Sequence, residues 1–313
     1  EDKRDNLLLA VARERSTLGL AWLSLASGHF CVMETAVTNM TAELERIAPS
    51  EILVPDDATA ELLNGSPAPV KRLPPWQFDF DSARRVLNRQ FETHDLSGFG
   101  AAGLTAALSA AGALLEYARS TQGTAIAHVK SMVVEQARAW VRMDPATRRN
   151  LELTETIRGE PAPTLFSLLD TCVTGMGSRL LRHTLHHPLR DRAALAPRLG
   201  AVATLAGGPG DAPWRALHGV LRQCADVERI TARIALKSAR PRDLSGLRET
   251  LERLPQLSEM LDSRPAPRLV ELGRALAPQH DLAALLAAAI KAQPAAVLRE
   301  GGVIADGYDA ELD

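Results

Sequence analysis

The beginning of the chain alternates short apolar runs with turn signals, which is the pattern of a β-sheet. Three such runs occupy residues 6–12, 18–25 and 29–33. Ser27-Gly28 is a turn signal between the second and the third of them. Runs of this length, joined by tight turns, predict three consecutive antiparallel strands.

The periodicity then changes from that of a strand to that of a helix. Met40, Leu44 and Ile47 lie at helical spacing, and Pro49 follows them. A helix over residues 38–47 is therefore predicted, with these side chains on its buried face. Residues 51–54 predict a fourth strand. Three strands, a helix and a fourth strand indicate a mixed α/β domain.

Two more helices are predicted before the pattern breaks. Asp81 is a candidate N-cap for a helix that ends at Phe91. Alanines and leucines dominate residues 101–117, which predicts a long buried helix. Polar and glycine residues follow at 120–123, so we place a domain boundary after residue 121. Residues 1–121 are expected to form the α/β domain.

Beyond this boundary the strand signals nearly vanish, apart from short extended pieces predicted at residues 129–134 and 140–143. Helices are predicted from Thr164 and from about Met176, the second ending before Pro188. Helical spacing recurs in two later sets of apolar residues: Leu217, Leu221, Cys224, Val227 and Ile234, then Leu244, Leu247, Leu251 and Leu254. The second set predicts a seam between packed helices, with Pro241 and Pro255 interrupting the chain at its ends. Residues 122–313 are therefore expected to form an all-α domain.

Composition narrows the possible functions. The chain is 46% hydrophobic and 24% charged, as in globular proteins, and its formal charge of −2 gives no electrostatic indication of nucleic-acid binding. The three cysteines are widely spaced, which argues against a zinc cluster or disulfide framework and for a reducing compartment. No apolar run is long enough for a membrane span, and the charged start lacks an apolar signal region. These features predict a cytoplasmic protein.

Motifs for nucleotide and metal chemistry are missing or incomplete. No GxxxxGK[ST] loop is present, and the glycine-rich residues 207–210 lack its lysine. His183, His186 and His187 lie together, and His183 and His187 have the i,i+4 spacing of two metal ligands on a helix; a metal also needs a third ligand and a shaped pocket, and the glutamate of an HExxH motif is missing here. Histidines at the end of a helix that Pro188 stops are the favoured interpretation. We therefore expect no metal site, no cofactor site and no catalytic residue.

The order of strands and helix in the α/β domain is also that of RNase H-like folds. Nucleases of this fold hold two metal ions with carboxylates, one of which comes from the middle of the first strand. Here that strand is Asn-Leu-Leu-Leu-Ala-Val-Ala, and Glu14 comes only after it. The domain is therefore expected to have the nuclease fold without an active site.

Several blocks in the second half resemble, in the same order, the core domain of the bacterial DNA mismatch-repair MutS family. They are MDPATRRNLEL at 143–153, TLFSLLD at 164–170, VTGMGSRLLR at 173–182 with Pro188-Leu189, DVERI at 226–230, ARPRDL at 239–244 and GGVIADGY at 301–308. The α/β domain resembles the family's connector more loosely, through residues 5–8, 79–81 and 96–100. Cys172 and Thr184 depart from the family's usual Thr and Trp.

This resemblance implies a fragment that contains the connector (residues 1–121) and the first part of the helical core (122–313), ending before the DNA clamp. The mismatch-reading domain, with its Phe-x-Glu motif, the clamp and the ATPase are not part of it. The family's ATP and Mg²⁺ would bind in that ATPase of the parent protein. Without the returning core helices, we expect the leucines of residues 244–261 to be exposed.

The resemblance further implies that the segment links the mismatch-binding, clamp and ATPase domains and transmits conformational change between them. It would not be an enzyme, whereas its parent would be a DNA-dependent ATPase. The implied partners are mismatched double-stranded DNA (through other domains), a MutL-type protein at the connector and a second MutS subunit. The implied location is the cytoplasm, on the nucleoid when bound to DNA. A different hypothesis is a stand-alone helical interaction module with a catalytically inactive RNase H-like domain.

Charged and small residues in the matching blocks are the candidates for coupling between domains. They are Arg148, Asn150, Asp170, Thr174, Gly177, Arg179, Asp226, Glu228, Arg229, Arg233, Arg240 and Asp243. Such charges beside apolar helical stripes form ion pairs or caps that fix helix orientation, and a glycine allows close backbone approach. Two interpretations remain open at this point. The residues hold the fold, or they fix levers whose motion couples distant sites.

Overall fold

The computed structural model describes residues 5–58, 68–136, 139–208 and 210–311. The chain divides into two compact units. The sheet unit comprises residues 2–170 and 179–190, and the helical unit comprises mainly residues 171–178 and 191–313. Among the described residues, no helix combines the length and the apolar character needed to cross a bilayer.

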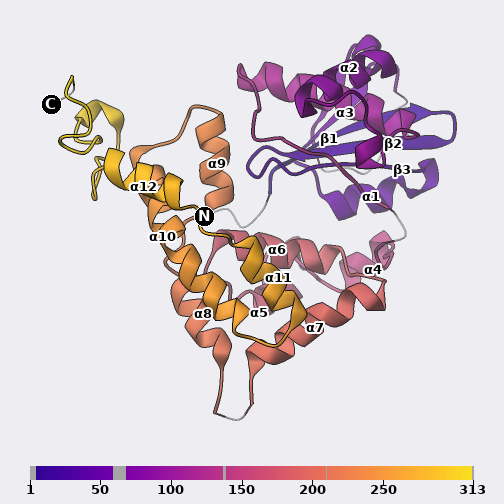
Figure 1. The fold of residues 1–313 in the computed structure, drawn as a ribbon. Coiled ribbons are helices and arrows are strands. Elements are labelled where there is room, and N and C mark those ends of the chain that lie inside the picture. The colour runs from indigo at the N-terminus through magenta and orange to yellow at the C-terminus, as the bar shows by residue number, and fades with distance from the viewer. Residues whose placement is uncertain (1–4, 59–67, 137–138, 209, 312–313) are drawn as a thin grey trace. The chain divides into compact units, whose positions relative to one another are not determined.

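A six-stranded mixed sheet forms the centre of the sheet unit (Figure 1). Its strands run in the order β5-β4-β1-β2-β3-β6. They are β1 (Leu7–Glu14), β2 (Thr17–Ser24), β3 (Phe30–Ala36), β4 (Glu51–Pro55), β5 (Val70–Leu73) and β6 (Val133–Val134). The first three form the predicted antiparallel meander, and β4, β5 and β6 pair in parallel with their neighbours. The four strands predicted at the beginning of the chain are confirmed.

Side chains alternate between the two faces of the sheet, and each face has its own helices. Leu9 of β1 lies opposite Trp22 of β2, and both pack with Leu44 of helix α1 (Met40–Ile47). Helices α2 (Phe80–Phe91) and α3 (Thr105–Gln122) cover the other face (Figure 1). The period-2 alternation therefore buries both faces of the central strands, as their nearly continuous apolar sequence requires.

Two predicted helix starts on this face need correction. Asp79, not Asp81, caps α2, because the carboxylate of Asp79 accepts the backbone N–H of Ser82 at 2.9 Å. Asp81 lies in the first turn instead and pairs with Arg84 at 3.3 Å. The helix predicted over residues 101–117 begins later and ends later, as α3. The boundary predicted after residue 121 stays a prediction.

Short elements complete this unit and lead into a helix that contributes to both units. They are the 3₁₀ helices η1 (Val37–Asn39), η3 (Pro75–Phe78) and η4 (Ser97–Phe99), and the helices α4 (Pro145–Asn150) and α5 (Leu165–Leu169). Helix α6 (Gly175–His186) has its first residues in the helical unit and its last residues in the sheet unit. Thr164 caps α5 in a capping box with Ser167, as its position predicted. The extended pieces reduce to β6 and a bridge between Trp140 and Leu189.

The helical unit contains six further helices among its described residues. They are α7 (Arg192–Ala206), α8 (Pro213–Leu221), α9 (Val227–Ala235), α10 (Pro241–Asp262), α11 (Pro267–Ala275) and α12 (His280–Ala289), followed by η5 (Leu298–Glu300). Cys224 lies between α8 and α9, so the apolar set from Leu217 to Ile234 belongs to two helices and not to one.

Pro255 lies inside α10 and does not end it, contrary to the interruption that the sequence predicted. A proline in a helix interior costs about 3 kcal/mol, because it removes a hydrogen bond and crowds the preceding turn. The leucines on both sides offset this cost. Leu251 and Leu257 are buried in two separate cores, so packing keeps the helix continuous.

The prediction that the α10 leucines would be exposed is wrong. Leu247, Leu251, Leu257 and Leu261 are all at most 9% exposed. Leu286 of α12 covers the first half of α10, and Leu269 of α11 covers the second half. The helices that follow α10 therefore cover the seam without any further domain.

Arg248 of α10 binds the segment that follows α12. Its buried guanidinium donates to the carbonyl oxygens of Ile290 (2.9 Å), Lys291 (3.4 Å) and Ala292 (3.3 Å). A bridge between Ile290 and Ile304 pairs this segment with the GGVIADGY block. Three carbonyls of the segment that follows α12 are thus satisfied by one charged donor.

Candidate functional site

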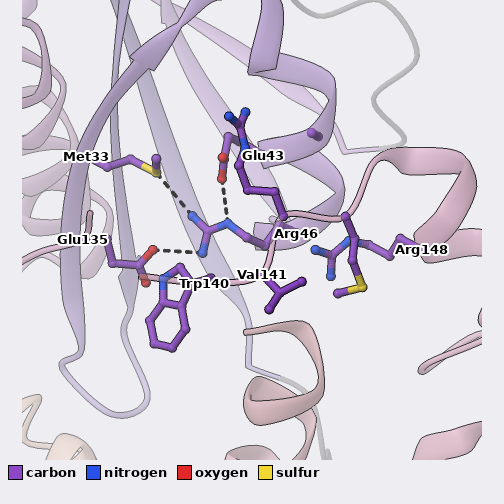
Figure 2. Close-up of a pocket in the computed structure, with 10 residues that line it drawn as sticks. Met33, Glu43, Arg46, Glu135, Trp140, Val141 and Arg148 are labelled. Atoms are coloured by element: carbon purple, nitrogen blue, oxygen red, sulfur yellow. Dashed lines mark hydrogen bonds and ion pairs between the residues drawn. The ribbon is translucent and has the colours of Figure 1, made fainter. Parts of the chain in front are cut away.

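Arg46 of α1 lies at the centre of a buried polar cluster in the sheet unit (Figure 2). Its Nε donates to Glu43 at 2.6 Å, and its Nη1 lies 2.9 Å from Oε2 of Glu135, just after β6. The guanidinium also lies 5.3 Å from the centre of the Trp22 ring. All three charged side chains are at most 10% exposed. One arginine thus neutralises two carboxylates that the fold has removed from water.

A third partner, His187, accepts a hydrogen bond from the same guanidinium. Nη1 of Arg46 lies 2.5 Å from Nε2 of His187, and the Nδ1–H of His187 donates to the carbonyl of His183 at 2.8 Å. These partners fix the neutral tautomer that carries its proton on Nδ1. Burial, followed by the nearby charges of His183 and Arg46, lowers the pKa of His187 to about 2.

Burial raises, rather than lowers, the pKa of the Glu135 carboxyl group in this cluster. Removal from water raises the pKa of Glu135, and the positive charge of Arg46 opposes that rise. Burial, followed by the charge of Glu135, also raises the pKa of the Cys31 thiol. Cys31 is therefore an unreactive thiol of the sheet core, since the thiolate is the reactive form.

A neighbouring polar group fastens the end of helix α6 within the same unit. Nη1 of the buried Arg148 donates to Nδ1 of His186 at 2.8 Å, and Nε2 of His186 lies 2.9 Å from the hydroxyl of Thr154. Burial lowers the pKa of Arg148. Trp140 packs edge-on against His183 and His187, with ring centroids 6.4 and 5.4 Å apart. The last turn of α6 is thus fixed by charged and aromatic contacts.

The space among these side chains is small. A cavity of about 30 Å³ lies between Met33, Glu43, Arg46, Trp140 and Arg148. This volume suits water but not a substrate. A larger hollow of about 500 Å³ lies over η3, α2 and α3, beside Lys71, Trp76 and Tyr117. Its lining includes one carboxylate, Glu116, and one amine, Lys71.

The residues predicted for coupling do not form a single site. Near the start of α6, the hydroxyl of Thr174 accepts the N–H of Gly177 at 3.1 Å, and Arg179 lies 3.6 Å from Asp5. A Cβ on Gly177 would lie 3.1 Å from that hydroxyl, so the glycine allows a close turn. Only Arg148, among the predicted residues, lies in the lining of the small cavity.

The predicted charges of the helical unit form caps and pairs around α9 and α10. Asp226 caps α9 through the N–H of Arg229 at 3.3 Å. Arg233 binds both carboxylate oxygens of Asp243 (2.9 and 2.6 Å), which also accepts the N–H of Arg240. Burial alone would raise the pKa of Asp243, but its bonds to Arg233 and Arg240 outweigh that effect and lower it. These contacts fix how α9 meets α10.

The other three predicted residues lie at or beside helix ends. Asn150 is exposed at the end of α4, Asp170 follows α5, and Glu228 is exposed in the first turn of α9. In contrast, Arg46, Glu43, Glu135 and Trp140 were not predicted at all. The closest sequence signal was the pair His183 and His187, which marked the end of α6 but not its partners.

Two comparisons with known families agree with this architecture. Residues 6–130 match the family model of MutS domain II, and residues 146–313 match that of MutS domain III. The second match alone covers more than half of the 313 residues, and the chain belongs to the MutS family. It is therefore part of a DNA mismatch-repair protein, with a mixed-sheet domain followed by a helical domain.

Proposed function

We propose that this segment transmits conformational change between the mismatch-binding, clamp and ATPase domains of a longer mismatch-repair protein. The observation that carries the proposal is helix α6. Its first residues belong to the helical unit and its last turn is fixed in the sheet unit by Arg148 and His187. A continuous helix whose last turn is fixed by buried contacts can pass on a displacement of its first turn.

The proposal extends to partners and chemistry outside this segment. ATP and Mg²⁺ would bind in an ATPase domain of the longer protein, and the segment itself would have no catalytic role. Mismatched DNA would be gripped through other domains. A MutL-type protein would dock on the connector, a second subunit would complete a homodimer, and the protein would act in the cytoplasm on the nucleoid. The net charge of −2 supports an indirect role in DNA binding.

The first test is DNA binding by the 313-residue chain. We expect equally weak binding to matched duplexes and to duplexes with one mismatch, because the net charge is slightly negative and base discrimination requires side chains in the grooves. Fluorescence anisotropy titrations at fixed salt would measure both dissociation constants. A mismatch preference of about tenfold, or about 1.4 kcal/mol, would contradict the proposal.

The second test compares two adjacent arginines of α4 in the longer protein. Arg148→Met removes the donor to His186, whereas Arg149→Met changes a side chain that is 64% exposed. We expect Arg148→Met to keep mismatch affinity but to slow ATP-induced release from DNA by about fivefold, the low end of typical coupling energies. Stopped-flow dissociation would measure the rate. Equal rates for the two variants would refute transmission through this contact.

A further inference from the structure

The structure places three potential metal ligands together at the end of α6. Ligand atoms of Glu135, His183 and His187 all lie within 4.8 Å of one another. The two imidazoles are one helical turn apart and stacked, with centroids 3.9 Å apart. Glu135 follows β6 and supplies the third ligand from a distant part of the sequence.

The orientation of His187 is that of a metal-binding histidine. Its Nδ1–H donates to a backbone carbonyl at 2.8 Å, which leaves the lone pair on Nε2 directed toward the cluster. Histidines that bind metals usually make this second hydrogen bond, because it fixes the tautomer and the ring. His187 is buried, whereas His183 is exposed. The site therefore has a fixed buried ligand and an open side, where His183 and water can complete the coordination.

Arg46 now holds the position that an ion would take. Its Nη1 contacts both Nε2 of His187 and Oε2 of Glu135. An entering cation would replace one positive partner by another, so the carboxylate would stay neutralised. Displaced from these two groups, Arg46 would keep its 2.6 Å bond to Glu43.

We propose that Glu135, His183 and His187 form a site for a divalent metal ion of the zinc class, in exchange with the guanidinium of Arg46. Two imidazoles and one carboxylate favour Zn²⁺, Co²⁺, Ni²⁺ or Cu²⁺ over Mg²⁺ and Ca²⁺, which prefer sets of oxygen ligands. Three protein ligands leave a position for water. The bound ion would fasten the end of α6 to the residue after β6.

The test is a metal titration of the 313-residue chain, prepared without a histidine tag. Isothermal titration with Zn²⁺ should show one ion bound per chain, and Mg²⁺ should show none. His183→Ala, a change at an exposed position, should weaken Zn²⁺ binding at least tenfold. His280→Ala removes another exposed histidine, in α12, and should leave the affinity unchanged.

Spectroscopy supplies a signature that a structural role of His183 would not give. In His183→Cys the site keeps three ligands, so Co²⁺ should bind and produce a thiolate-to-cobalt charge-transfer band. Cu²⁺ should quench tryptophan emission in the native chain, and Trp140→Phe should reduce that quenching, because Trp140 packs against both histidines. Equal Zn²⁺ affinity in the native chain and His183→Ala, or no charge-transfer band in His183→Cys, would overturn the proposal.

Discussion

Arg46→Met should destabilise the sheet unit by about 3–5 kcal/mol, the usual effect of removing one partner from a buried ionic group. Methionine approximates the aliphatic part of arginine but leaves the carboxylates of Glu43 and Glu135 in a buried site without their cation. It also removes the donor to Nε2 of His187. Urea denaturation followed by tryptophan fluorescence would measure the change, since Trp22 and Trp140 lie beside this cluster.

The matched control is Arg84→Met on α2. Arg84 pairs with Asp81 at 3.3 Å, but both side chains are more than half exposed. Exposed pairs contribute only about 0–1 kcal/mol, because water screens them. A similar small loss in Arg46→Met would mean that the buried cluster does not stabilise the sheet unit.

The destabilisation by Arg46→Met should also depend on pH, with a sign that follows from its neighbours. Without Arg46, the folded-state pKa of Glu135 rises further above its unfolded value, so the penalty grows as pH rises above that unfolded value. His187, whose folded pKa is depressed to about 2, costs stability as pH falls below its unfolded value near 6.5. The Glu135 effect makes the difference between variant and native chain larger at pH 8 than at pH 6, whereas burial keeps His187 neutral in the folded chain over this range, so His187 does not add to the difference.

The sequence predicted elements well where local chemistry determines them. Residues 6–33 gave the three strands, and Thr164 gave the start of α5, because alternation and capping depend on neighbouring residues. The predictions from sequence were wrong where long-range contacts outweigh local conformational preference. Pro255 stays helical because two distant cores bury the leucines around it. Likewise, α11 and α12 cover leucines that the sequence predicted to be exposed.

The candidate site was harder to predict because its residues come from distant segments. Arg46 meets His187 across 141 positions of sequence, and no local pattern relates them. Arg46 looked like an ordinary basic residue in the last turn of α1, and Glu135 looked like a loop carboxylate. The sequence singled out Arg148 through its block and the pair His183 and His187 through their spacing, but the partners of these residues followed only from the structure. These charges affect stability because they are buried, and no local sequence pattern shows that they are buried.

A second large effect is expected from a single methyl group at Gly19, in the middle of β2. A Cβ at this position would lie 2.0 Å from the carbonyl carbon of Ala106 and 2.2 Å from the backbone N of Ala107, in the first turn of α3. These are backbone atoms, so no rotation of a side chain can relieve the overlap. Sheet and helix would have to separate, and Gly19→Ala should therefore cost about 3 kcal/mol, the upper part of the range for overpacked cores.

The helix cannot separate from the sheet freely, because Glu34 of β3 holds the same turn. Its carboxylate accepts the N–H groups of Ala106 (2.9 Å) and Ala107 (3.2 Å), which a displaced α3 would lose. Gly200→Ala in α7 is the control, since a Cβ there meets nothing within 4 Å. That change should stabilise its helix by about 0.5–1 kcal/mol. Urea denaturation should show opposite signs for the two substitutions, and a loss below 1 kcal/mol for Gly19→Ala would mean that α3 does not lie this close to β2.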